Sequence, residues 1–174
     1  MESLKRLALD IGGYEVRLSP QKTIVIATLT IRFQRATKGQ FRRSTPETYT
    51  VKPLVEVDGE PLFGELAVLR WLQKDGWDGV WVDTYHGDRL FWKGLPDRTA
   101  PAILPPKATA LYDRIVEVNG RRAGFFDVFA WRGREFLFVE YKGKGDSIKP
   151  NQLSWIKSAI KAGVPVSSLV LVVH

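Results

Sequence analysis

The most regular hydrophobic pattern lies in the last fifty residues of the chain. Alternating positions with period two predict β-strands, and a stretch with a period near 3.6 predicts an α-helix. The expected elements are strands at 125–131, 135–142 and 166–173 and a helix at about 150–162. Between the first two strands, Gly133 and Arg134 fit a two-residue type II′ turn, which requires positive φ at its first position. The pattern therefore predicts an antiparallel hairpin followed by a helix and a further strand.

The earlier part of the chain changes period several times. Residues 23–34 are rich in β-branched side chains and predict a strand with Val25, Ala27, Leu29, Ile31 and Phe33 on one face. Residues 34–53 carry five cations with little periodicity and predict an exposed loop or hairpin. Pro61 suits the first position of a helix, and the leucines at helical spacing after it predict a helix that ends before Gly76. A strand at about 78–86 and a second helix at 106–120 complete the expected elements.

The predicted hairpin brings charged residues into strands that are apolar on both faces. Its turn sets the register, so that Trp131 faces Phe136, Phe129 faces Phe138 and Asp127 faces Glu140. Lys142 then shares the face of the two acids, and the other face receives Phe126, Val128, Ala130, Leu137, Val139 and Tyr141. Carboxylates about 5 Å apart repel by about 3 kcal/mol at an effective dielectric constant near 20. Folding alone does not favour such a pair, so either one carboxyl group is protonated or a cation lies between them.

Four interpretations of this pair are open. A hard divalent metal such as Mg²⁺ takes oxygen ligands and keeps several waters, and Lys142 would then polarise a water or a phosphate oxygen. Alternatively, Lys142 neutralises both acids in a purely structural ion-pair network. A register slip of one residue would separate the acids altogether. Retaining glycosidases also place two carboxyl groups about 5 Å apart, but the lysine and the basic surface argue against that chemistry.

Composition and charge narrow the class of protein. The 174 residues, of which 44% are hydrophobic, suit one folded domain, and the absence of cysteine excludes disulfides, thiolate metal sites and cysteine nucleophiles. The formal charge of +7 favours a polyanionic partner such as nucleic acid, although solubility alone would also explain it. No apolar run approaches the length of a membrane span. We therefore expect no membrane partner and a cytoplasmic, nucleoid or nuclear protein that is not secreted.

The Asp strand "AGFFDVFAW" and the stretch "VEYKGKGDSIKPNQLSWIKSAIKAGVPVSSLVLVV" resemble the VRR-NUC branch of the PD-(D/E)XK nuclease superfamily. The shared pattern is a Gly-x-x-Asp strand, a Glu-x-Lys strand, a Gly-rich link, Gln and Trp early in a helix, and a final strand. The resemblance is close over residues 123–173 and extends less clearly back to the helix after Pro61. In two places the chain departs from the pattern: Phe126 stands where the family commonly has Pro, and Tyr141 where it often has a smaller or β-branched residue.

The resemblance implies a role for each matching residue. Asp127, Glu140 and the backbone carbonyl of Tyr141 would hold Mg²⁺, for which Mn²⁺ can substitute, and Lys142 would position the attacking water. Gln152 would face the site from the helix. Three further roles are expected: Glu65 as a metal-binding acid or else a solvated helix residue, and Lys144 and Lys149 as phosphate contacts or else solvated cations.

These observations lead to an α/β fold with a restriction-endonuclease-like mixed sheet, whose core order is helix, three strands, helix, strand. We expect one nuclease domain over 1–174, with a β-rich extension at 1–55 and the core at 56–174. The expected activity is metal-dependent endonucleolytic cleavage of DNA that is branched or duplex, selective for a flap or a four-way junction, with a homodimer supplying two sites. The alternatives are a non-catalytic nucleic-acid-binding module that retains this fold and a protein-interaction domain.

Overall fold

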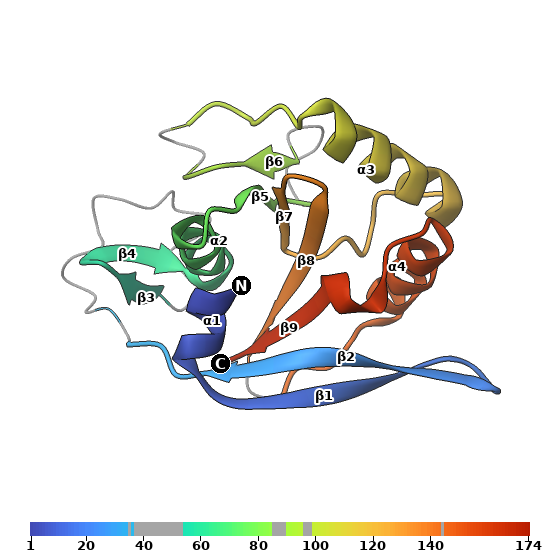
Figure 1. The fold of residues 1–174 in the computed structure, drawn as a ribbon, viewed down its shortest axis with the longest axis horizontal. Helices are drawn as coiled ribbons and strands as arrows, with labels where there is room; N and C mark the ends of the chain where they lie inside the picture. The colour runs from blue at the N-terminus through green and yellow to red at the C-terminus, as the bar shows by residue number, and fades with distance from the viewer. Residues whose placement is uncertain (35, 37–53, 85–89, 96–98, 144) are drawn as a thin grey trace.

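The computed structural model describes residues 1–34, 36, 54–84, 90–95, 99–143 and 145–174. Helices cover both faces of a seven-stranded sheet, and a two-stranded ribbon lies beside it (Figure 1). The helices are α1 (Glu2–Leu7), α2 (Gly64–Lys74), α3 (Pro106–Asn119) and α4 (Pro150–Lys161), with a 3₁₀ turn at Val166–Ser168. The strands are β1 (Ala8–Ser19), β2 (Lys22–Ile31), β3 (Leu54–Val57), β4 (Glu60–Phe63), β5 (Asp78–Val82), β6 (Phe91–Trp92), β7 (Val128–Arg132), β8 (Glu135–Lys142) and β9 (Leu169–Val173).

The sheet has the strand order β1-β2-β9-β8-β7-β5-β6. Strand β9 runs parallel to both β2 and β8, and the other pairings are antiparallel. This mixed sheet flanked by helices confirms the predicted fold class and is consistent with a restriction-endonuclease-like architecture. The β-rich residues 1–55 do not form a separate layer in the described part of the chain, because β2 pairs with β9 and extends the same sheet.

The start of α2 differs from the sequence prediction. Pro61 was expected at the first helical position, but it lies in β4 opposite Glu56 of β3, and the helix begins at Gly64. The cause is the turn at Asp58 and Gly59, whose φ angles of 54° and 78° suit a tight two-residue hairpin and pair the short strands. Leu62 is buried in the core all the same.

The N-terminal segments also depart from the simple alternation. Leu29, Ile31 and Phe33 are buried as expected, but Val25 is 57% exposed, and Ile26 on the opposite face is fully buried. Strand β2 therefore has apolar contacts on both faces where it lies inside the sheet. The predicted basic loop at 34–53 falls almost wholly outside the described residues. No helix among the described residues is long and apolar enough to cross a membrane.

Two hydrophobic layers hold the sheet between the helices. Helix α2 packs on one face, against Val128, Ala130, Leu137 and Val139 of the β7–β8 hairpin. Helices α3 and α4 pack on the other, where the ring of Trp155 contacts Phe125, Phe126 and Phe138. Phe126 was expected on the face of Val128, and that prediction was wrong because β7 begins only at Val128. The chain before it takes a different course and turns Phe126 towards α4.

Gly64 sets how closely α2 approaches β8. A Cβ atom at this position would lie 2.3 Å from two ring atoms of Tyr141, so the helix start and the aromatic ring are in direct contact. Only a residue without a side chain permits this distance. The first turn of α2 is thereby fixed beside the strand that carries Glu140 and Lys142.

We predict that Gly64→Ala lowers the free energy of unfolding by about 1–3 kcal/mol, because the added methyl group overpacks the contact with Tyr141. Urea unfolding followed by circular dichroism measures the change. Gly12→Ala is the matched control, since no atom lies within 4 Å of a Cβ there, and its effect should stay within about 0.5 kcal/mol. Equal stabilities of the two variants would contradict the close contact.

Candidate active site

The β7–β8 hairpin has the register that its turn predicts. Trp131 lies opposite Phe136 and Phe129 opposite Phe138, and Gly133 has a φ of 61° at the first turn position. The register-slip interpretation is therefore wrong. The ladder ends at Val128 and Val139, one residue before the predicted pair of acids. Glu140 thus lies at the point where the two strands begin to separate.

Glu140 and Lys142 form a buried ion pair on the α4 side of β8. They are 3% and 5% exposed, and the Lys142 Nζ lies 3.0 Å from the Glu140 Oε1. Gln152 of α4 closes this pair into a ring: its Nε2 donates to the Glu140 Oε1, and its own Oε1 accepts from the Lys142 Nζ at 2.9 Å. Three buried polar side chains from one strand and one helix are therefore bonded to one another.

The start of α4 fixes the position of Gln152. Lys149 is the N-cap residue, Pro150 takes the first helical position, and Gln152 is the third residue of the first turn. The Gln152 Oε1 accepts the backbone N–H of Lys149 at 3.0 Å, so a side chain satisfies a donor that the helix leaves unpaired. The same atom therefore caps the helix and binds Lys142.

Asp127 is tied to the same strand by a backbone contact. It is half-buried, and its Oδ2 accepts the N–H of Tyr141 at 2.8 Å. The N–H and C=O of one strand residue point to the same side, so the Tyr141 carbonyl faces the side on which Asp127 lies. The carbonyl of Lys142 points the other way and accepts the N–H of His174 at 2.9 Å. Asp127, Glu140 and the Tyr141 carbonyl are thus gathered where the hairpin strands diverge.

One buried oxygen of this group has no hydrogen-bond partner, the Oε2 of Glu140. Burial raises the pKa of the Glu140 carboxyl, and the Lys142 ammonium and the hydrogen bonds from Lys142 and Gln152 offset this only in part. The backbone N–H of Asp127 is near enough to favour the charged form, but it is not in hydrogen-bond geometry with the Oε2. An unsatisfied buried acceptor costs about 1–3 kcal/mol. A site with no ligand to bind would gain nothing from leaving that oxygen unpaired.

Glu65 approaches from the opposite side of the sheet. It is half-buried in the first turn of α2, next to Gly64, whose contact is the ring of Tyr141. Burial and the negative charge of Glu65 raise the pKa of the Tyr141 hydroxyl, which therefore stays neutral at physiological pH. The Tyr141 side chain belongs to the α2-side layer, whereas Glu140 and Lys142 bond to α4. The structure places Glu65 beside the site strand and not within the ring of polar side chains.

The donor set suits a hard divalent cation. Among the residues that the structure describes, no three His, Asp or Glu side chains gather into a metal-binding cluster. Two carboxylates, one of which has the unpaired oxygen of Glu140, and a backbone carbonyl nevertheless match the preference of Mg²⁺, which is commonly held by one or two carboxylates with waters completing its shell. The residues that would hold it are Asp127, Glu140 and Tyr141, through its carbonyl oxygen.

Gly124 and Asn119 position the site, and only one of them left a signal in the sequence. Gly124 has a φ of 87°, and a Cβ there would lie 2.2 Å from the Asn151 carbonyl oxygen, so the chain entering Asp127 crosses α4 at its first turn. Its sequence signal was the Gly-x-x-Asp spacing. Asn119 donates to the carbonyls of Arg121 and Ala123, and its Oδ1 accepts from Ser154 and Ser158. Nothing in the sequence marked Asn119 beyond its place at a helix end.

The two predicted phosphate contacts have different outcomes. Lys144 lies outside the described residues. Lys149 is exposed at the start of α4, three positions before the buried Gln152. Its side chain can therefore meet a ligand that approaches the ring of polar side chains from solvent.

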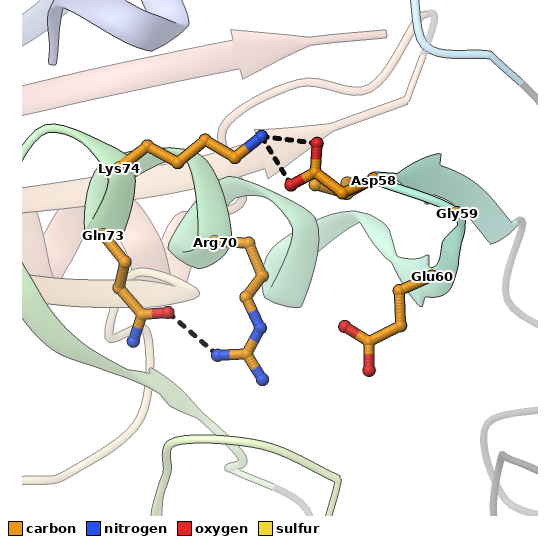
Figure 2. Close-up of a pocket in the computed structure, with 7 residues that line it drawn as sticks. Asp58, Gly59, Glu60, Arg70, Gln73 and Lys74 are labelled. Carbon is orange, nitrogen blue, oxygen red and sulfur yellow. Dashed lines mark hydrogen bonds and ion pairs between the residues drawn. The ribbon is translucent and has the colours of Figure 1, made fainter.

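A separate hollow of about 520 Å³ lies between the β3–β4 turn and α2 (Figure 2). Its charged side chains largely satisfy each other: Lys74 lies 2.6 Å from Asp58, and Arg70 donates to Gln73 at 2.9 Å. Glu60 supplies a second acid at its rim. Two acids against two cations leave no net charge, so this hollow does not have the character of a phosphate-binding site.

The comparisons with known proteins agree with the geometry. The family model of the VRR-NUC domain matches residues 67–170. No curated protein and no solved structure matches the chain. The matched range covers more than half of the 174 residues and includes Asp127, Glu140, Lys142 and Gln152, while Glu65 precedes it. The chain belongs to the VRR-NUC family of the PD-(D/E)XK nuclease superfamily.

Proposed function

We propose that the protein is an endonuclease that hydrolyses DNA phosphodiester bonds with Mg²⁺, or with Mn²⁺ in its place. The observation that carries the proposal is the unpaired, buried Oε2 of Glu140, which lies in a ring with a buried lysine and beside a strand that brings Asp127 close. A purely structural ion pair would have both carboxylate oxygens satisfied. An oxygen held ready for a ligand is what a metal-dependent hydrolase requires.

Lys142 and Gln152 have different roles in the ring of polar side chains. An ammonium group has three hydrogen-bond donors, and two of those of Lys142 bond to Glu140 and Gln152. The third donor, which has no partner within the described part of the chain, can hold the attacking water or a non-bridging phosphate oxygen. Gln152 keeps the lysine in this orientation, since its amide bonds both neighbours at once.

A divalent cation at this site would be held by Asp127, the Oε2 of Glu140 and the carbonyl of Tyr141. When bound, such a cation polarises the phosphoryl group and lowers the pKa of a coordinated water. The repulsion that the two acids would otherwise suffer is relieved by the same charge. The protein contributes the fixed ligand directions, because both acids are tied to one strand.

The preferred substrate is a branched DNA. A single small domain offers little surface for reading base sequence, so selection by shape, for example of a flap or a four-way junction, is the better expectation. The positive net charge of +7 supports attraction to the phosphate backbone. The homodimer that would cut both strands of a junction stays a prediction, to be tested by the mass of the protein in solution with and without DNA.

We predict that Asp127→Asn and Glu140→Gln each lower the cleavage rate by at least about 100-fold, because each removes a charged ligand of the cation. Gel assays with linear, flap and junction DNA in Mg²⁺, Mn²⁺ or EDTA measure the rates. Asp58→Asn, an acid outside the site that is paired with Lys74, is the control and should cut as well as wild type. Cleavage that survives EDTA and both substitutions would exclude the metal mechanism, whereas DNA binding without any cutting would favour the non-catalytic module.

We predict that Gln152→Ala lowers kcat by about 10- to 100-fold and raises the Mg²⁺ concentration needed for half-maximal rate, with little change in KM for DNA. The reason is that Lys142 and Glu140 lose the amide that orients them, while the DNA-binding surface is unchanged. Steady-state rates across a Mg²⁺ titration give all three quantities. Asn151→Ala, the neighbouring α4 position, is the control, and a matching loss there would show that the helix start and not the ring is responsible.

Glu65 stays a proposed additional acid. Because it reaches the site strand from the α2 side, we predict that Glu65→Gln lowers the cleavage rate less than Glu140→Gln does, by about 10-fold. The same gel assay measures both variants. A loss as complete as that of Glu140→Gln would place Glu65 among the direct ligands.

A further inference from the structure

Helix α4 connects the candidate active site with the opposite end of the molecule. Its first turn carries Gln152, and its last turn carries Lys161, one helical turn after Lys157. Both lysines are exposed, and the sequence of the helix, PNQLSWIKSAIK, contains no acid. The exposed side of α4 is therefore uniformly positive from the middle of the helix to its end.

A hollow of about 710 Å³ lies at that far end, between the β7–β8 turn, α3 and the segment after α4. Its lining includes Trp77, Arg114, Arg132, Arg134, Ser167 and Ser168. Arg132 is already engaged: it lies 4.7 Å from the centre of the Trp77 ring and 3.1 Å from a carboxylate oxygen of Glu135. The ion pair with Arg132 neutralises Glu135, which is the one acidic residue among those that line the hollow.

Arg114 and Arg134 are the two remaining cationic side chains of the hollow; the N-terminal ammonium of Met1, which also lines it, is paired with Asp75 at 2.7 Å. Both are exposed, and neither forms a hydrogen bond or an ion pair with another residue that the structure describes. Asp113 and Glu117 of α3 are near Arg114 in the sequence but do not line the hollow. Guanidinium groups with serine hydroxyls beside them are suited to phosphate oxygens, which accept several hydrogen bonds at once.

The distance between the hollow and the active site can be read from strand β8. The strand runs from Glu135, beside the hollow, to Lys142 in the polar ring, and Figure 1 shows it extending from the β7–β8 turn towards the end of β9. A rise of about 3.3 Å per residue makes this span roughly 23 Å. Duplex DNA rises about 3.4 Å per base pair, so the hollow lies about seven base pairs from the site of cleavage.

We propose that Lys157 and Lys161 of α4, together with Arg114 and Arg134 at the hollow, form a track that binds the phosphate backbone of one duplex arm of the substrate. The track begins at Lys157 in the middle of α4 and leads the arm away from the cut. This inference rests on the proposed function, since it names the part of a DNA substrate that the surface holds. The four cations of the track contribute to the affinity for DNA and to the placement of its duplex arm, and not to the chemical step.

The test is a binding measurement in EDTA, where no cleavage takes place. Fluorescence anisotropy compares wild type with the Arg114→Gln/Arg134→Gln double variant on hairpin-closed duplexes of 5 and 20 base pairs. The shorter duplex, about 17 Å long, cannot reach from the active site to the hollow, whereas the longer one can. We expect weaker binding of the longer duplex alone, and a plot of log affinity against log salt that is less steep by about 1.8, which corresponds to two phosphates.

The control double variant Arg70→Gln/Lys74→Gln removes the same charge from the hollow on the α2 side (Figure 2). It should leave affinity and salt dependence close to wild type. Lys157→Gln/Lys161→Gln tests the track independently of the hollow, and thermal melting checks that each variant is folded. An unchanged salt dependence in both track variants, or an equal loss in the control or on the short duplex, would overturn the proposal. Because binding needs no turnover, a protein that binds in this way without cutting would refute the proposed activity and leave the track intact.

Discussion

The ion pair between Glu140 and Lys142 is the constraint on which the rest of the site depends. Taking both charges out of water costs several kcal/mol per ion, and mutual attraction offsets this only with good geometry and additional hydrogen bonds. Gln152 supplies those bonds, and to do so α4 must start at the open end of β8. Among the buried side-chain atoms without a partner in the described residues, the Oε2 of Glu140 is the one carboxylate oxygen, a local cost that the proposed ligand binding would explain.

The surrounding fold keeps the strand and the helix at that distance. Gly124 lets the chain before Asp127 pass against the first turn of α4, and Asn119 bonds that same segment and α4 together. On the other face, Gly64 brings α2 against Tyr141. Each contact depends on a small or doubly hydrogen-bonded residue at a crossing point, so the site geometry is set by backbone approach as much as by the polar side chains of the candidate site.

Local patterns predicted the β7–β8 hairpin and the start of α4 better than they predicted the start of α2 and the course of the chain before β7. The turn at Gly133 and the period of two fixed the hairpin register before any coordinates, and the start of α4 followed from Pro150 and its apolar spacing. The start of α2 was misplaced because a tight turn at Asp58 overrides a helical run of leucines. Phe126 was placed on the wrong face because the strand ends where the acids diverge, which periodicity does not reveal. The ring closed by Gln152 joins residues whose contact only the tertiary fold creates.

The parallel pairing of β2 with β9 has a consequence for how the molecule assembles. Ala27 pairs with Val170, 143 positions later, so the inner edge of the N-terminal hairpin stays open during synthesis until residue 170 has emerged. Contacts so distant in sequence form slowly, and an open strand edge can pair with a neighbouring chain in the meantime. The yield of folded protein, after synthesis or after refolding from denaturant, should therefore be limited by aggregation at high protein concentration. Chaperones that shield strand edges should increase that yield.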